Sequence, residues 1–129
     1  MFTLTMITPE GKKHHSEHTR ISLPTDDGVR TILENHMDAV IPVEIGIVKL
    51  ITNKESESVV VSEGIFYFQD NVARLIVRTF EFSEEIDVVR AERARDRAQD
   101  KLSKELDTQE LHEAELALKR ALTRLSVRR

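Results

Sequence analysis

The stretch TFEFSEEIDVVRAERARDRAQDKL, residues 79–102, changes its pattern of apolar residues at Phe82. The runs that lead up to Phe82 are short and rich in β-branched residues, which is typical of strands. After Phe82, alanines recur three and four residues apart, at positions 91, 94 and 98, which is typical of an amphipathic helix. We therefore expect two domains that meet here, a strand domain over residues 1–82 and a helical domain over residues 83–129.

The strand domain is predicted to be an antiparallel β-sandwich or a flattened barrel. Phe2, Leu4 and Met6 alternate on one face of the first run, and turn residues follow at TPEG (8–11), DG (27–28) and NKES (53–56). There is no room for the long crossovers that parallel strands need. Seven to ten short strands are expected, from the runs FTLTMI, HTRISL, AVIPVEIGIVKLI, VVV, IFYF and VARLIVRTF.

The helical domain is predicted to be a two-helix antiparallel hairpin, which makes the fold class α+β. Ser83 is the expected N-cap of the first helix, with acidic residues 84, 85 and 87 in its first turn. Residues 105–109 interrupt the pattern, and a second helix is expected from about Glu110. Such a hairpin supports itself poorly, so we expect it to be mobile. The two stripes expected to pack together are Ala91, Ala94, Ala98 and Leu102 against Leu111, Ala114, Leu118, Leu122 and Leu125.

Composition limits the classes of function. The chain has 129 residues and no cysteine, which indicates one ordinary soluble protein of a reducing compartment. No apolar run approaches the ~20 residues of a membrane span, and no secretory signal is apparent. Residues 1–82 carry 8 basic and 12 acidic side chains and residues 83–129 carry 11 of each, so nucleic-acid binding is disfavoured.

Arginines are the most distinctive residues of the helical domain. Their spacing of three and four places them on one face of each helix, and an antiparallel hairpin would bring the two faces together. Guanidinium groups bind phosphate oxygens in a bidentate manner. The alternative is a solvated face of weak ion pairs, with Glu92, Asp96 and Asp100 as partners. The arginines are Arg90, Arg93 and Arg97 on the first helix and Arg120 and Arg124 on the second.

Other candidate sites are weaker. No glycine-rich phosphate loop and no constellation of nucleophile, acid and base are visible, so no enzymatic activity is expected. HHSEH (14–18) favours a solvated polar loop over a metal site, and no metal ligands are assigned. IFYF (65–68) favours a core strand over a platform for stacking bases.

Several motifs together resemble one family, the epsilon subunit of bacterial F-type ATP synthase. They are LTMITPEG (4–11), DG (27–28) followed by ENH (34–36), EEIDVVRAERARDRAQDKL (84–102) and ELALKRALTRLSV (115–127). The resemblance covers essentially the whole chain. It is looser at residues 31–38, where the family commonly has G-x-L-P-x-H-A-P and this chain keeps only Leu33 and His36. The turn geometry of that segment is therefore open.

The resemblance also implies a site for a regulatory ligand. Residues 86–91 are similar to the I/L-D-x-x-R-A signature through which some epsilon subunits bind ATP. By this resemblance Ile86 and Asp87 address the adenine, Glu81 lies beside the nucleoside, and four arginines hold the phosphates. No cofactor is required, and ATP is a regulatory ligand only. The implied ATP-binding residues are Glu81, Ile86, Asp87, Arg90, Ala91, Arg97, Arg120 and Arg124.

The function implied is that of a non-catalytic subunit of the central stalk, or rotor. It would couple the catalytic head to the ion-translocating ring, and its mobile hairpin would inhibit ATP hydrolysis. Its partners would be the gamma subunit, the membrane ring and, with the hairpin extended, the catalytic alpha and beta subunits. It would lie at the cytoplasmic face of the bacterial cell membrane. The alternative is a free-standing interaction module, a sandwich with a helical arm.

Overall fold

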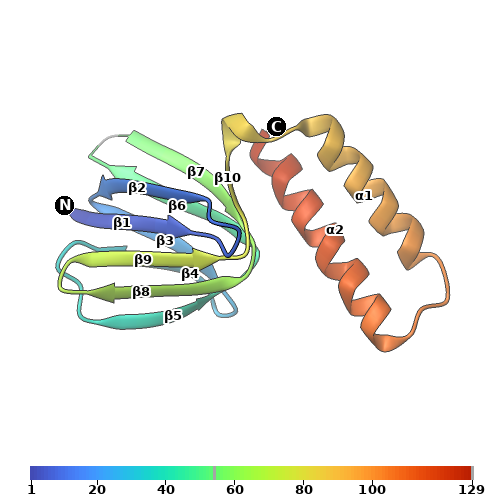
Figure 1. Cartoon of the computed structure of the whole chain (residues 1–129), viewed down its shortest axis with the longest axis horizontal. Coiled ribbons are helices and arrows are strands. Elements are labelled where there is room, and N and C mark those ends of the chain that lie inside the picture. Colours follow the sequence, from blue (N-terminus) through green and yellow to red (C-terminus); the bar gives the residue numbers. More distant parts are fainter. Residues whose placement is uncertain (54, 129) are drawn as a thin grey trace. The chain divides into compact units, whose positions relative to one another are not determined.

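The computed structural model describes residues 1–53 and 55–128. The chain separates into two compact units, Met1–Phe82 and Ser83–Arg129. The first is a β-sandwich and the second a helical hairpin (Figure 1). The predicted fold class, a sandwich followed by two helices, is confirmed.

Over the described residues 1–53 and 55–82, the sandwich consists of ten strands in two five-stranded sheets, whose orders are β2-β1-β9-β8-β5 and β10-β7-β6-β3-β4. All pairs are antiparallel except β1 with β9, which run parallel. The sequence did not indicate this exception, because pairing between the first strand and the ninth is a long-range choice. The strands are β1 (Phe2–Ile7), β2 (Lys13–His18), β3 (Arg20–Thr25), β4 (Gly28–Leu33), β5 (Ala39–Val43), β6 (Gly46–Thr52), β7 (Glu55–Val61), β8 (Gly64–Gln69), β9 (Val72–Val77) and β10 (Phe80–Phe82).

The predicted turns have mixed outcomes. At TPEG the amide of Gly11 donates to the carbonyl of Thr8 at 3.0 Å, and Gly28 takes a φ of 108° in the turn between β3 and β4. Within NKES, Lys54 lies outside the described residues, and the last two residues belong to β7. The prediction of a loop at HHSEH is wrong, because these residues form β2 through a full ladder with β1.

The core lies between the two sheets, where alternate residues of each strand point inward. Phe2, Leu4 and Met6 are buried on the predicted face of β1. In β8, Phe66 and Phe68 are buried while Tyr67 lies on the outer face, so IFYF is confirmed as a core strand. Burying aromatic and branched side chains on both inner faces provides most of the stabilisation of such a sandwich.

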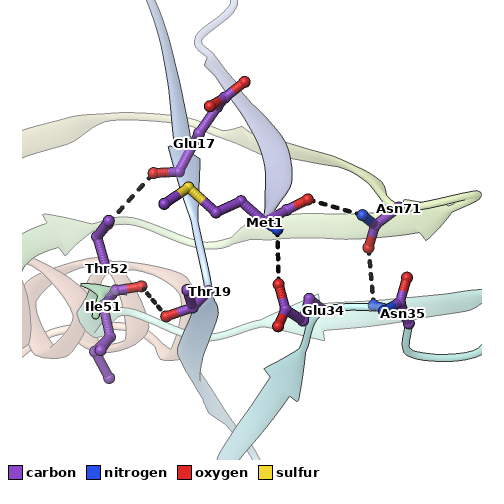
Figure 2. A network of polar contacts seen from close by, with 8 residues as sticks. All are labelled: Met1, Glu17, Thr19, Glu34, Asn35, Ile51, Thr52 and Asn71. Carbon is purple, nitrogen blue, oxygen red and sulfur yellow. Dashed lines mark hydrogen bonds and ion pairs between the residues drawn. The ribbon is translucent and has the colours of Figure 1, made fainter.

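Polar contacts hold the segment between β4 and β5, where the chain departs from the family pattern (Figure 2). Asn35 adopts a left-handed φ of 63°, which asparagine tolerates, and its amide donates to the side chain of Asn71 at 2.8 Å. Asn71 in turn donates to the carbonyl of Met1 at 2.8 Å, and the Met1 ammonium pairs with Glu34 at 2.7 Å. These contacts fix a turn that has neither the glycine nor the prolines of the family pattern.

The helical unit has a short 3-10 turn at Ser83–Glu85 followed by α1 (Val88–Leu102) and α2 (Thr108–Arg128). The predicted starts of both helices are therefore corrected. Asp87, rather than Ser83, caps α1, because its carboxylate accepts from the amide of Arg90 at 3.1 Å. The second helix begins two residues before Glu110, where the carboxylate of Asp107 accepts from the amide of Glu110 at 2.8 Å.

A buried histidine ties β2 of one sheet to β6 of the other. The Nδ1 atom of His18 lies 2.8 Å from the Thr52 hydroxyl, and Nε2 lies 2.6 Å from the Ser16 hydroxyl. Thr52 uses its single hydrogen to donate to the carbonyl of Glu17 at 3.3 Å. It must therefore accept from His18, which places a proton on Nδ1 of the ring.

Burial lowers the pKa of His18 from its ordinary value, because desolvation disfavours the imidazolium. The carboxylate of Glu57 opposes this effect, and His14 adds to it. The unfolded chain therefore takes up a proton at higher pH than the folded chain does. Stability is then lost as the pH falls below about 6.5 and toward the folded pKa.

We expect the free energy of unfolding of the sandwich to decrease between pH 7 and pH 5, by at most about 1.4 kcal/mol per pH unit from this one group. Urea titrations at several pH values measure it. His18→Gln should flatten the dependence, and His15→Gln, on the same strand but exposed, should leave it unchanged. An equal slope in wild type and His18→Gln would contradict the assignment.

Candidate functional site

The helical hairpin is held by a seam of small side chains. Ala91 and Ala98 of α1 and Ala114, Ala121 and Leu125 of α2 are buried, and the two helices contact each other along their length. The predicted stripes are buried at Ala91, Ala98, Ala114 and Leu125, and Ala121 is buried beside them. Because alanine needs little volume, such a seam lets two helix backbones approach closely.

Two of the leucines expected in this seam lie outside it. Leu111 and Leu122 are 40% and 46% exposed, whereas Ala121, which the prediction omitted, is fully buried. The reason is rotation about α2: the contact follows positions 114, 121 and 125, and positions 111 and 122 fall on a neighbouring face.

The arginines have a regular relation to the seam. Arg90 and Arg97 each come one residue before a buried alanine of α1, and Arg120 and Arg124 each come one residue before a buried residue of α2. One residue is a rotation of about 100° around a helix, so each arginine flanks the contact.

Arginines that flank the seam in this way lie on one side of the hairpin. Two antiparallel helices are related by a two-fold axis perpendicular to the plane that contains both helix axes. Rotation about this axis exchanges the helices and keeps each residue on its own side of that plane. Equivalent flanking positions of α1 and α2 therefore share a side. The start of α1 also lies beside the end of α2 (Figure 1), which brings Arg90 and Arg124 to the same end of the hairpin.

The alternative prediction, that nearby carboxylates neutralise the arginines of α1, does not describe this side of the hairpin. Two of the expected partners are engaged elsewhere, Asp96 with Arg95 at 3.1 Å and Asp100 with Lys104 at 3.3 Å. Within residues 1–53 and 55–128, no ion pair is formed by Arg90, Arg93 or Arg97. Unneutralised guanidinium groups on one face favour the binding of an anion.

The remaining predicted residues lie in different surroundings. Arg120 and Arg124 are half-buried and already interact with other groups, as does Glu81, which lies on β10 of the sandwich. Ala91 is buried in the seam, where its role is packing.

Ile86 and Asp87 occupy the entry to α1. The side chain of Ile86 is only 4% exposed. Asp87 is exposed, and one carboxylate oxygen accepts the capping hydrogen bond from the amide of Arg90. The second oxygen of Asp87 is the group that could accept from an amino group of a ligand.

A cavity of about 430 Å³ opens between the helices toward their connecting turn. Of the residues predicted to bind ATP that the structure describes, only Arg97 lines this cavity. The i, i+4 spacing of Arg97 and Lys101 could have identified this basic rim in the sequence. The lining consists of Ala94, Arg97, Ala98, Lys101, Lys104, Leu106, Glu110, Glu113, Ala114 and Ala117.

The role of Asp107 as the cap of α2 was not predicted from the sequence. Its spacing to Glu110 is that of an N-terminal capping box, a recognisable signal. The hydrogen bond from the amide of Glu110 holds the pKa of Asp107 below its usual value. Asp107 therefore fixes where α2 begins.

Two kinds of feature are absent from the described residues. No group of three His, Asp or Glu side chains among them is arranged to hold a metal ion. In the same part of the chain, no helix is both long and apolar enough to cross a bilayer.

Comparison with known proteins gives matches over the whole chain. Two family models match, "ATP synthase, Delta/Epsilon chain, beta-sandwich domain" over residues 1–83 and "ATP synthase, Delta/Epsilon chain, long alpha-helix domain" over residues 84–128. The ATP synthase epsilon chain of Bacillus licheniformis is 36% identical over 124 residues, which cover 96% of this chain and 95% of that one. The epsilon chain of Bacillus velezensis is 34% identical over 122 residues, with 95% and 92% covered.

Solved structures show the same fold at lower identity. A chain of the Euglena gracilis mitochondrial ATP synthase matches with a TM-score of 0.74 and 24% identity, covering 90% of this chain and 74% of that one. A chain of the central stalk and c-ring of the Tetrahymena thermophila mitochondrial enzyme matches with a TM-score of 0.70 and 16% identity, covering 98% and 96%.

The seam predicts a contrast between two leucines of α2. Leu125→Ala should destabilise the hairpin by about 2–5 kcal/mol, or up to its full stability, because it leaves a cavity. Leu122→Ala should change it by less than about 0.5 kcal/mol, because that side chain is half in solvent. Native-state hydrogen exchange of the α1 and α2 amides measures both. Equal effects of the two substitutions would contradict the seam.

Proposed function

The chain belongs to the ATP synthase delta/epsilon-chain family, and from this premise we propose that it is a non-catalytic central-stalk subunit of a bacterial F-type ATP synthase. It couples the catalytic head to the ion-translocating ring at the cytoplasmic face of the membrane. Its partners are the gamma subunit, the ring and, in one state of the hairpin, the catalytic alpha and beta subunits. The similarity to epsilon chains over both domains supports this proposal and disfavours a free-standing module.

The hairpin is proposed to bind ATP as a regulatory ligand. The observation that carries this is the row of arginines flanking the alanine seam, of which Arg90 and Arg97 form no ion pair with any described residue. A nucleoside triphosphate supplies several phosphate oxygens for such a row. Asp87 is oriented by its capping bond, so its second oxygen is available to the adenine amino group.

Regulation follows if the hairpin has two states. In the compact state the seam is closed and the arginines lie on one side of the hairpin. In the extended state the seam opens, and the same arginines can reach acidic surfaces of the catalytic subunits. This contact inhibits ATP hydrolysis. ATP that binds only the compact state stabilises it by RT ln(1 + [ATP]/Kd). A ligand with equal affinity for both states would leave the ratio of compact to extended hairpin unchanged.

Isothermal titration calorimetry of the whole chain tests the site. Arg90→Ala and Arg124→Ala should each weaken ATP binding about 10- to 100-fold, since a charge-assisted hydrogen bond contributes about 1.5–3 kcal/mol. Arg95→Ala is the matched control, because Arg95 pairs with Asp96. An unchanged dissociation constant in both test variants would remove the phosphate clamp.

The adenine contact has its own variant. Asp87→Ser keeps a good N-cap and so preserves α1, but it removes the carboxylate that is proposed to contact the adenine of ATP. It should reduce the preference for ATP over GTP while the helical circular dichroism stays that of wild type. A preference equal to that of wild type would show that Asp87 only caps the helix.

A further inference from the structure

The cavity between α1 and α2 near their connecting turn extends beyond the proposed ATP site. Its volume is about 430 Å³, and Leu106 of the turn is among its lining residues. A helix rises about 1.5 Å per residue, so Lys101 at this end lies about 16 Å along α1 from Arg90. The cavity is therefore a second candidate site within the hairpin.

Alanines form most of the apolar part of the lining. Ala98 and Ala114 are each only 3% exposed, and Ala94 and Ala117 are half-buried. Pockets for small molecules are typically lined by apolar side chains with a few polar groups that fix orientation, and range from roughly 300 to 1,000 Å³. This cavity is at the lower end of that range, so it suits a small ligand with an apolar body.

The charged residues of the lining are divided between the two helices. Three cations, Arg97, Lys101 and Lys104, come from α1 and the turn, and two carboxylates, Glu110 and Glu113, come from α2. The spacing of three or four residues places each set on one side of its own segment. The cavity therefore has a cationic wall and an anionic wall.

The two walls do not neutralise each other. Lys104 pairs with Asp100, which is not part of the lining, at 3.3 Å. Over residues 1–53 and 55–128, no other ion pair involves a cation or a carboxylate of the two walls. Opposite charges that line one cavity without pairing are both available to a ligand.

This division of charge determines which ligand chemistry fits. A simple anion beside Lys101 would also face the carboxylates of α2, and a simple cation beside Glu113 would also face the cations of α1. In both cases the repulsion from one wall opposes the attraction to the other. A molecule that carries one charge of each sign is attracted by both walls.

We propose that this cavity binds a small zwitterion with an apolar body, of the chemical class of the large neutral amino acids. Its anionic group lies beside Lys101, its ammonium group lies beside Glu110 and Glu113, and its apolar part rests on the alanines. Such a ligand contacts both helices and so stabilises the closed hairpin. The inference goes beyond the proposed function and does not require ATP.

Alanine-methyl NMR of the full chain, titrated with L-leucine, tests the site. The methyl signals of Ala94, Ala98, Ala114 and Ala117 should shift, and that of Ala73 in the sandwich core should not. Two fragments of leucine are the ligand controls: 4-methylpentanoate lacks the ammonium group, and 3-methylbutylamine lacks the carboxylate. Each should bind about 10-fold more weakly than leucine, as expected for the loss of one charge-assisted hydrogen bond.

Substitutions test each wall separately. Lys101→Gln and Glu113→Gln should each weaken leucine binding about 10-fold, because each removes one charge from one wall. The matched controls are Lys119→Gln and Glu115→Gln, which change the same residue types on α2 outside the lining and should bind as wild type does. Ala117→Leu keeps every charge but fills the apolar part of the cavity, so it should abolish binding.

Hydrogen exchange gives an independent readout. A ligand that binds only the closed hairpin should slow exchange of the α1 and α2 amides by a factor of 1 + [leucine]/Kd and leave the sandwich amides unchanged. Exchange that leucine does not slow in the hairpin would contradict the proposal.

The other outcomes are equally decisive. If leucine shifts none of the four methyl signals, or if folded Ala117→Leu binds it as wild type does, the cavity is not the site. If 4-methylpentanoate or 3-methylbutylamine binds as tightly as leucine, the site recognises a single charge and the zwitterion is refuted. None of the substituted residues belongs to the proposed ATP site, so these results and the ATP titrations are independent of each other.

Discussion

The seam of buried, mainly small side chains between α1 and α2 is the constraint on which the candidate site depends. Ala91 and Ala98 of α1 and Ala114 and Ala121 of α2 are buried, and side chains of this size allow two helices to approach closely. The antiparallel packing puts the flanking arginines of both helices on one side, and the small side chains of the seam allow the two rows to lie close together. A seam of leucines would separate the two rows by a wider layer of side chains.

The same seam buries little apolar area in the hairpin. Alanine buries little apolar area, so each buried position contributes less stabilisation than a leucine would. The sandwich differs, since Phe2, Phe66, Phe68 and Phe80 are all fully buried in its core. The two domains therefore differ in how much large apolar surface holds each of them together.

The two outer faces of the sandwich carry side chains of mixed polarity. Both faces consist of residues that alternate with a common core, so the core places no demand on their polarity. One outer face carries Ser22 and Lys49 beside exposed Val29 and Leu33 of β4, and the other exposes Ile65 of β8 and Ile76 of β9.

The sequence by itself determined the α+β class, the change from strand to helix after Phe82, the family resemblance and the arginine spacing on each helix. These are local or compositional properties, and the period of apolar residues is sufficient to read them. It misplaced the start of α1, because Ser83 and Asp87 are both good caps and only the fold selects between them. It placed Leu111 and Leu122 in the seam, because a stripe drawn on one helix lacks the rotation that the partner helix imposes.

Only the tertiary structure decided which charges are paired and which strands are neighbours. Asp96 and Asp100 were plausible partners for several arginines, and their actual pairing with Arg95 and Lys104 depends on side-chain geometry that spacing does not specify. The parallel pairing of β1 with β9 joins the two ends of the sandwich domain. Contacts between residues far apart in sequence depend on the whole packed core, which no local pattern records.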